Sequence, residues 1–95
     1  MLTSKQRAIL RGMAQNTDPI FQIGKNGVGD EACTQIGNAL EARELIKVTV
    51  LENSGYGTKE AAEAVAEATG ADVVSCVGRR FVLYRRSVKK PKIEL

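Results

Sequence analysis

The sequence predicts an α/β fold in a single domain, with elements in the order α-β-α-β-α-β-β. Three segments carry apolar residues at helical spacing, and four short segments rich in Val, Ile and Leu are typical of strands. Ninety-five residues suffice for one core but not for two domains. Right-handed crossovers would pair the strands that flank the second and third helices, giving a mixed four-stranded sheet packed with three helices.

The first helix is expected from about Ser4 to Ala14. Thr3 and Gln6 have the spacing of a capping box at its start. Three apolar residues form the expected buried stripe: Ile9, Leu10 and Met13. Arg7 and Arg11 fall on the opposite face, where they are either a solvated cationic surface or part of a binding surface.

A glycine-framed loop, Gly24-Lys25-Asn26-Gly27, follows a short predicted strand over residues 20–23. The two glycines permit a positive φ and a close approach to a ligand, and Asn26 also tolerates the left-handed region. Asp30 is the expected N-cap of the next helix. Amide groups, a helix N-terminus and Lys25 together predict a phosphate-binding loop.

The second helix is expected to end near Arg43. Cys33, Ile36 and Leu40 form its apolar stripe, with Glu41 and Glu44 on the exposed side. Arg43 shares the apolar face, so it either snorkels or compensates the helix dipole, or it faces a ligand. The two cysteines, Cys33 and Cys76, are isolated in the sequence and are interpreted as small buried residues.

The strand over residues 45–51 alternates, with Lys47 and Thr49 on its less buried face. A third helix over residues 59–69 has an alanine-rich face and an acidic face that should point away from any nucleic acid, formed by Glu60, Glu63 and Glu67. Strands over residues 73–77 and 80–84 are expected to form a hairpin with a type II′ turn at Gly78-Arg79. Tyr84, on the last strand, either packs on the sheet or stacks on a base.

Basic and acidic residues are unevenly distributed, although the net charge is only +3. Residues 1–29 carry a net charge of +3, residues 30–70 one of −5 and residues 71–95 one of +5. If the two ends of the chain meet, the molecule has a basic side that suits a polyanion. Residues 87–95 lack periodicity and are expected to form a mobile basic tail after a domain over residues 1–86.

Three motifs resemble those of the CRM domain, named for chloroplast RNA splicing and ribosome maturation. They are Ile23–Gly27 (IGKNG), Ala42–Val48 (ARELIKV) and Gly78–Arg85 (GRRFVLYR), in this order. The resemblance spans about residues 2–86 and is strongest to the stand-alone bacterial, YhbY-like form. It implies a fold related to the C-terminal domain of a translation initiation factor, and association with precursors of the large ribosomal subunit.

The resemblance assigns RNA binding to the loop residues Gly24, Lys25, Asn26 and Gly27. Arg43 stands where the family pattern has histidine; it keeps a hydrogen-bond donor and adds a fixed charge. Charge alone extends the expected RNA surface to further residues: Arg7, Arg11, Arg43, Lys47, Arg79, Arg80, Arg85 and Arg86, with Tyr84 beside them.

Other functions fit the sequence less well. The spacing GxxGxG matches neither usual nucleotide-binding signature, and a chain without histidine lacks the usual base for nucleophile activation, so no enzyme activity and no cofactor or metal is expected. A KH-like module would place a helix before Gly24, and a protein-interaction module would use the acidic helix. Without an apolar run long enough for a membrane span, we expect a cytoplasmic protein, and we expect it to be a monomer. The resemblance implies that its partner is large-subunit rRNA.

Overall fold

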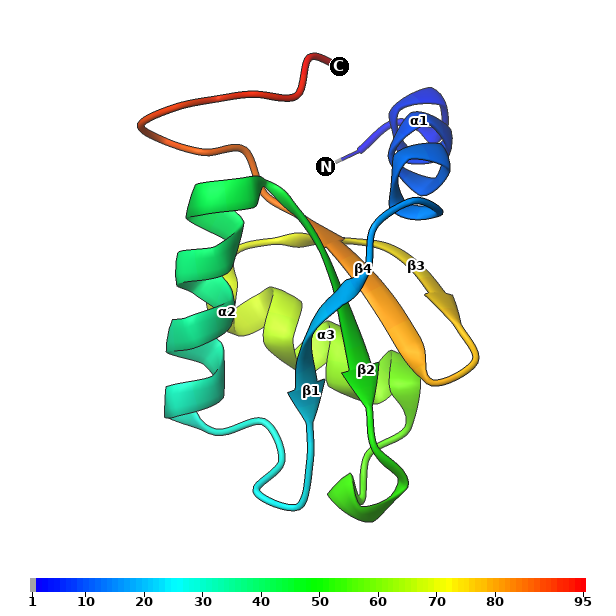
Figure 1. Ribbon diagram of the computed structural model, residues 1–95, viewed down its shortest axis with the longest axis vertical. Coiled ribbons are helices and arrows are strands. Elements are labelled where there is room, and N and C mark those ends of the chain that lie inside the picture. The colour runs from blue at the N-terminus through cyan, green and yellow to red at the C-terminus, as the bar shows by residue number, and fades with distance from the viewer. Residues whose placement is uncertain (1) are drawn as a thin grey trace.

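The computed structural model describes residues 2–95 and confirms the expected order of elements (Figure 1). The three helices are α1 (Ser4–Ala14), α2 (Asp30–Arg43) and α3 (Thr58–Thr69). The four strands are β1 (Pro19–Ile23), β2 (Leu45–Val50), β3 (Asp72–Val77) and β4 (Arg80–Tyr84). A short 3₁₀ turn, η1 (Glu52–Ser54), lies between β2 and α3.

The sheet is mixed, with strand order β1-β2-β4-β3. β1 and β2 are parallel, as expected for strands on either side of α2. The expectation that the strands flanking α3 also pair is wrong, because β4 lies between β2 and β3 and is antiparallel to both. β4 is apolar on both of its faces, and a strand with that composition is stable at the centre of a sheet rather than at its edge.

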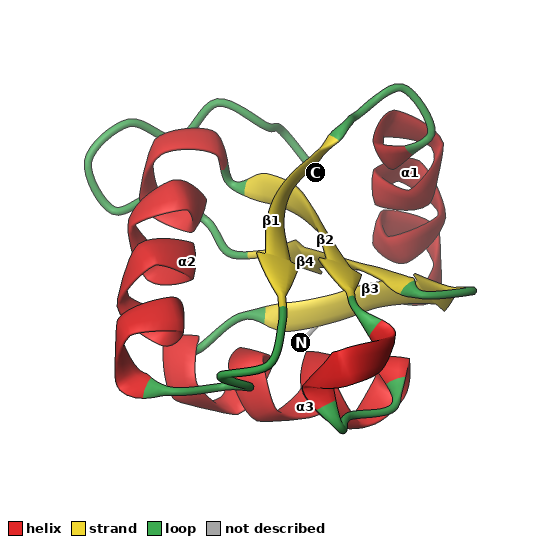
Figure 2. Ribbon diagram, turned by 60° about the horizontal axis from the view of Figure 1, so that its bottom comes forward, coloured by secondary structure: helices red, strands yellow, loops and turns green. Residues whose placement is uncertain are grey.

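Helices lie on both faces of the sheet (Figure 2), and each face has its own hydrophobic cluster. α2 and α3 cover one face, where Phe81 and Leu83 of β4 are fully buried. α1 covers part of the other face, where Val82 and Tyr84 of the same strand are buried. The period-two alternation of β4 therefore supplies both clusters.

The orientation of α1 differs from the expected one. Leu10 and Ala14 are buried against the sheet, whereas Ile9 and Met13 are 43% and 42% exposed. Arg7 follows the same stripe as Leu10 and is half-buried, with no hydrogen-bond partner at its Nε. The helix is thus rotated so that its arginine side, rather than its Ile9 side, turns toward the sheet.

The turns, the helix ends and the cysteines agree only in part with what was expected from the sequence. The Thr3 and Gln6 capping box is present, and Gly78 has φ +61° in the β3–β4 turn, as a type II′ turn requires. The N-cap of α2 is Gly29 rather than Asp30, which occupies the first helical position. Cys33 is half-buried and Cys76 is exposed, so the second cysteine is not the buried residue that was expected.

Within residues 2–95, no helix is both long and apolar enough to cross a lipid bilayer. The same residues contain no group of three or more His, Cys, Asp or Glu side chains placed to hold a metal ion.

Candidate nucleic-acid interface

The loop Gly24–Gly27 is a tight turn at the carboxyl end of β1. The Gly27 N–H donates to the Gly24 C=O at 2.8 Å, and Gly27 has φ +66°. A Cβ at Gly27 would lie 2.9 Å from Tyr56 Cε2, so this position needs glycine for both its conformation and its packing. Gly24 has no positive φ, and a Cβ there would make an ordinary contact with Leu51 at 3.6 Å. Of the two glycines, only Gly27 therefore plays the expected role.

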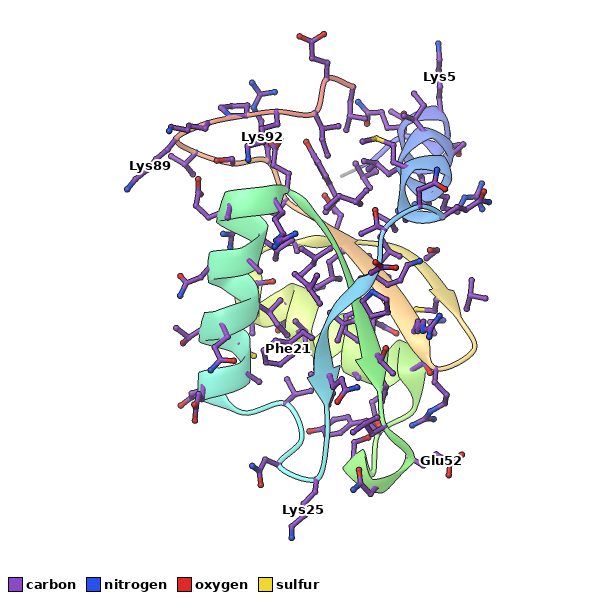
Figure 3. The ribbon with its side chains drawn as sticks, viewed as in Figure 1. Lys5, Phe21, Lys25, Glu52, Lys89 and Lys92 are labelled. Carbon is purple, nitrogen blue, oxygen red and sulfur yellow. The ribbon has the colours of Figure 1, made fainter. Side chains whose placement is uncertain are left out.

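Lys25 and Asn26 are exposed at the tip of this turn, and Lys25 points away from the molecule (Figure 3). A groove of about 410 Å³ lies beside the turn, bounded by β1 and the first half of α2. Phe21 of β1 and Gln35 of α2 line this groove, which was not apparent from the sequence. β1 is an edge strand, so its outer backbone groups have no partner strand and border the groove.

The segment behind the loop is held by Arg79. Its guanidinium donates to the carbonyl oxygens of Val50 (3.0 Å), Leu51 (3.0 Å) and Tyr56 (3.3 Å). Tyr56 in turn packs against Gly27. Arg79 was expected to contact RNA from the hairpin tip, but the structure uses its side chain to position the segment that supports the loop.

A second basic region lies on the α1 side of the sheet. Arg11 of α1, Lys47 of β2 and Arg80 of β4 line one groove of about 360 Å³. The side chains of Val77 and Val82 form apolar parts of the same groove. Three of the predicted cations, from elements far apart in the sequence, are therefore brought together.

The remaining predicted site residues are not part of these two grooves. Tyr84 is 7% exposed, so it packs under α1 rather than presenting a ring for stacking, and burial raises the pKa of its hydroxyl. Arg85 does not point outward. Its guanidinium donates to Thr69 O at 2.7 Å and to Gly37 O at 2.8 Å, which joins α3 to α2.

Arg43 and Arg86 are exposed but distant from the loop. Arg43 ends α2, and a helix of 14 residues places it about 20 Å from the N-terminal end beside the loop. Arg86 lies near the chain ends, in a hollow with Leu2 and Ile93. Lys89 and Lys92 lie at the end of the long axis opposite Lys25 (Figure 3). The expected basic side is therefore divided among separate parts of the molecule.

Two carboxylates at the end of α2 hold the C-terminal segment. Glu44, fully buried, accepts hydrogen bonds from the backbone N–H groups of Ser87 (2.8 Å), Lys92 and Ile93 (2.7 Å). Glu41 accepts hydrogen bonds from the Ser87 hydroxyl and from the N–H groups of Val88 and Lys89. The sequence placed both glutamates on a solvent-exposed face, which is wrong for Glu44.

These hydrogen bonds decide the ionisation of both groups. Burial raises the pKa of Glu44, but the three backbone donors outweigh it and hold the pKa below the ordinary value. The Ser87 hydroxyl and two backbone N–H groups lower the pKa of Glu41. Both side chains are therefore charged acceptors at neutral pH.

Residues 2–85 match the family model of the CRS1 / YhbY (CRM) domain. The chain is 46% identical over 95 residues to the Probable RNA-binding protein YqeI of Bacillus subtilis, covering 100% of this chain and 99% of that one. It is 35% identical over 94 residues to an RNA-binding protein of Haemophilus influenzae, covering 99% and 94%. The solution structure of a hypothetical protein from Staphylococcus aureus shares 49% identity and a TM-score of 0.83 over 100% of this chain and 99% of that one. The expected resemblance is confirmed, and the chain belongs to the CRS1 / YhbY (CRM) domain family.

Proposed function

We propose that this protein binds RNA through the turn Gly24–Gly27, and that its RNA is a segment of large-subunit rRNA held during ribosome assembly. The observation that carries the proposal is the exposed turn itself. Gly27 is in the left-handed region, Lys25 projects from the tip, and an open groove lies alongside. Relatives that match nearly the whole chain are named as RNA-binding proteins, which supports the same ligand here.

The proposed mechanism is a clamp on the sugar-phosphate backbone. Lys25 supplies a charge for a phosphate, and the Asn26 amide hydrogen-bonds a phosphate or a 2′-hydroxyl. Asp30 and Glu31 occupy the first turn of α2, where they offset the positive end of the helix dipole. The attraction for phosphate therefore comes from Lys25 and the turn rather than from the helix N-terminus.

The assignment to large-subunit rRNA rests on the family resemblance. CRM domains are named for ribosome maturation as well as splicing, and we assign this chain to the large-subunit precursor as a cytoplasmic monomer without catalytic activity. A KH-like function is less suitable, because the loop joins strand β1 to helix α2 instead of joining two helices.

Salt dependence tests the proposed RNA contact. Four cations line the two grooves or the loop tip: Lys25, Arg11, Lys47 and Arg80. Neutralising about four phosphates predicts a log–log slope of affinity against salt between about −3 and −4. Lys25→Glu should weaken binding of a structured RNA about tenfold or more and make this slope shallower, as measured by fluorescence anisotropy.

Lys5→Glu is the matched control, because Lys5 is also an exposed lysine but lies at the opposite end of the molecule (Figure 3). It should change the affinity little. Equal losses in both variants, or an affinity independent of salt, would contradict a localised contact at the loop. In-cell crosslinking with site mapping then identifies the RNA, and crosslinks outside large-subunit rRNA would refute the ribosomal assignment while leaving RNA binding intact.

A further inference from the structure

We propose that the groove between α1 and the sheet binds one unpaired nucleotide of the RNA held by the loop. The proposal rests on the proposed function and adds a second contact of different chemistry. Arg11, Lys47 and Arg80 supply the charges, and Val77 supplies the exposed apolar surface, with Ala14 and Val82 largely buried at the base of the groove. The phosphate would lie against the cations, with the base or ribose on Val77.

The sheet register places these side chains side by side. Lys47 pairs with Val82, and Val82 pairs with Ser75 on the other side of β4. Thr49 pairs with Arg80, and Arg80 pairs with Val77. Directly paired residues point to the same face of a sheet, so the two rows form the floor of one surface.

α1 covers only part of this face. Its buried residues Leu10 and Ala14 pack on the cluster that contains Leu45 and Tyr84. The row of Thr49, Arg80 and Val77 lies beyond that cluster, and Val77 is 75% exposed. The part of the face beyond this cluster is therefore open to a ligand and contains both cations and an exposed aliphatic side chain.

The rotation of α1 contributes a cation to this surface. If Ile9 and Met13 had been buried, as helical spacing alone suggested, Arg11 would have turned away from the sheet. The observed rotation leaves both apolar residues more than two-fifths exposed and puts Arg11 on the wall of the groove. Departures from a simple amphipathic pattern of this kind are typical of functional sites.

The mixture of side chains selects an unpaired nucleotide. A volume of about 360 Å³ is at the lower end of the range for small-ligand sites. In an RNA duplex the bases are stacked on each other and only the sugar-phosphate backbone and the groove edges are accessible, so the apolar floor would remain unused. A nucleotide outside a duplex presents phosphate and base faces together.

The groove is also within reach of the loop. Lys47 pairs with Pro19, and Val50, three residues later in β2, pairs with Ile23, which directly precedes Gly24. At 3.3 Å per residue the four strand positions from Lys47 to the level of Gly24 span about 13 Å. Gln22 and Thr49, which are paired in register, lie between the two sites on the same half of the sheet. One RNA with a duplex beside a short single strand could therefore contact both.

The test compares three fluorescently labelled hairpin RNAs whose stems are closed by a non-nucleotide linker, so that the loop itself supplies no unpaired base. The first has a blunt end, the second a single-stranded overhang of about four nucleotides, and the third the same overhang with abasic sites. The wild-type protein should bind the second hairpin about tenfold more tightly than the other two, because only that RNA supplies bases for the apolar floor.

Val77→Glu should abolish the preference for the overhang by placing a negative charge and a polar group in the groove. Val88→Glu is the matched control, since Val88 is 87% exposed and lies in the C-terminal segment, outside the groove. Arg80→Glu should lose the same preference. Thermal unfolding of each variant confirms that these exposed substitutions leave the fold intact.

The outcomes separate this inference from the proposed function. If the wild-type protein binds all three hairpins equally, or if Val77→Glu retains the preference, the groove does not hold a nucleotide, although RNA binding at the loop stands. If no hairpin binds, the proposed function fails as well. Lys25→Glu should lower the affinity for all three hairpins by the same factor, which distinguishes the loop contact from the groove contact.

Discussion

Glu44 connects three parts of the molecule at one residue. Its backbone N–H donates to Leu40 O at 2.7 Å at the end of α2, and its carbonyl accepts from the Arg85 N–H at 2.9 Å after β4. Its carboxylate holds the C-terminal segment. Glu44 also has φ +66°, a conformation that is strained for a residue with a side chain. The surrounding hydrogen bonds must offset that strain.

Glu44→Gln should lower the free energy of unfolding by about 2 kcal/mol. The amide oxygen can replace one carboxylate oxygen, but the amide nitrogen cannot accept from the remaining backbone donor. Urea unfolding measures the change. Glu31→Gln, an exposed glutamate in the first turn of the same helix, is the control and should change stability by less than about 0.5 kcal/mol.

The same variant tests the pH dependence. The pKa values of Glu41 and Glu44 are lower in the folded protein than in the unfolded chain. At a pH between the folded-state and unfolded-state pKa of either group, the unfolded chain therefore binds more protons. Their contribution to stability is present above about pH 5 and is lost as the pH falls through the folded-state pKa. The decline of stability on acidification should be shallower in Glu44→Gln, and an unchanged decline would contradict the assignment.

At the scale of elements, Arg79 determines how the segment after β2 supports the loop. Its planar guanidinium reaches three carbonyl oxygens of Val50, Leu51 and Tyr56, which a single ammonium group cannot do with the same geometry. The ring of Tyr56 then fills the space next to Gly27. The turn Gly24–Gly27 is therefore positioned by side chains from two later segments of the chain.

Arg79→Lys should increase the mobility of residues 51–57 and of the turn, while the net charge stays the same. Hydrogen–deuterium exchange should show faster exchange at the Gly27 and Leu51 amides, which donate to Gly24 O and Ile23 O. Arg80→Lys at the neighbouring position is the control. If these amides exchanged at the same rate in the two variants, the Arg79 hydrogen bonds would not determine the mobility of the loop.

Helix and strand positions could be predicted from the sequence because they depend on neighbouring residues. The capping box at Thr3 and the alternation of β4 are local signals, and both appear in the structure as expected. The rotation of α1 could not be predicted, since Leu10 fits a stripe with either Ile9 and Met13 or Ala14. Packing against the sheet decides between these two faces.

The candidate site was predictable only where a local motif defines it. The GxxG turn was predicted from four residues. The positive φ of Gly27 confirms that this turn needs glycine at its last position. The cations were identified from charge alone, which does not reveal whether a guanidinium meets solvent or carbonyl oxygens. Arg79 and Arg85 bind carbonyl groups of segments distant in sequence, and no local pattern contains that information.

At the scale of the whole molecule, the contacts of residues 87–95 lead to a test of their expected mobility. A chain that ends at Arg86 loses every hydrogen bond that these residues make to Glu41 and Glu44. It should be less stable by about 2 kcal/mol, because hydrogen bonds from this segment to two charged carboxylates are lost. A mobile tail would instead be removed without a change in the urea midpoint.

A double-mutant cycle sharpens this prediction. The truncation removes every hydrogen bond from this segment that Glu44→Gln weakens, so the combined effect should be smaller than the sum of the separate effects. Additive losses would show that the segment stabilises the fold through other contacts, such as the packing of Ile93 against the α1 cluster.

The central position of β4 has a consequence for how the protein is made. β4 is the last strand to leave the ribosome, yet β2 and β3 have no hydrogen-bonded connection without it. In a nascent chain that ends before Arg80, β3 is therefore unpaired. Both hydrophobic clusters of the sheet also lack the side chains that β4 contributes to them. The sheet can be completed only after β4 has left the ribosome, so residues 2–86 should fold in one cooperative step rather than strand by strand.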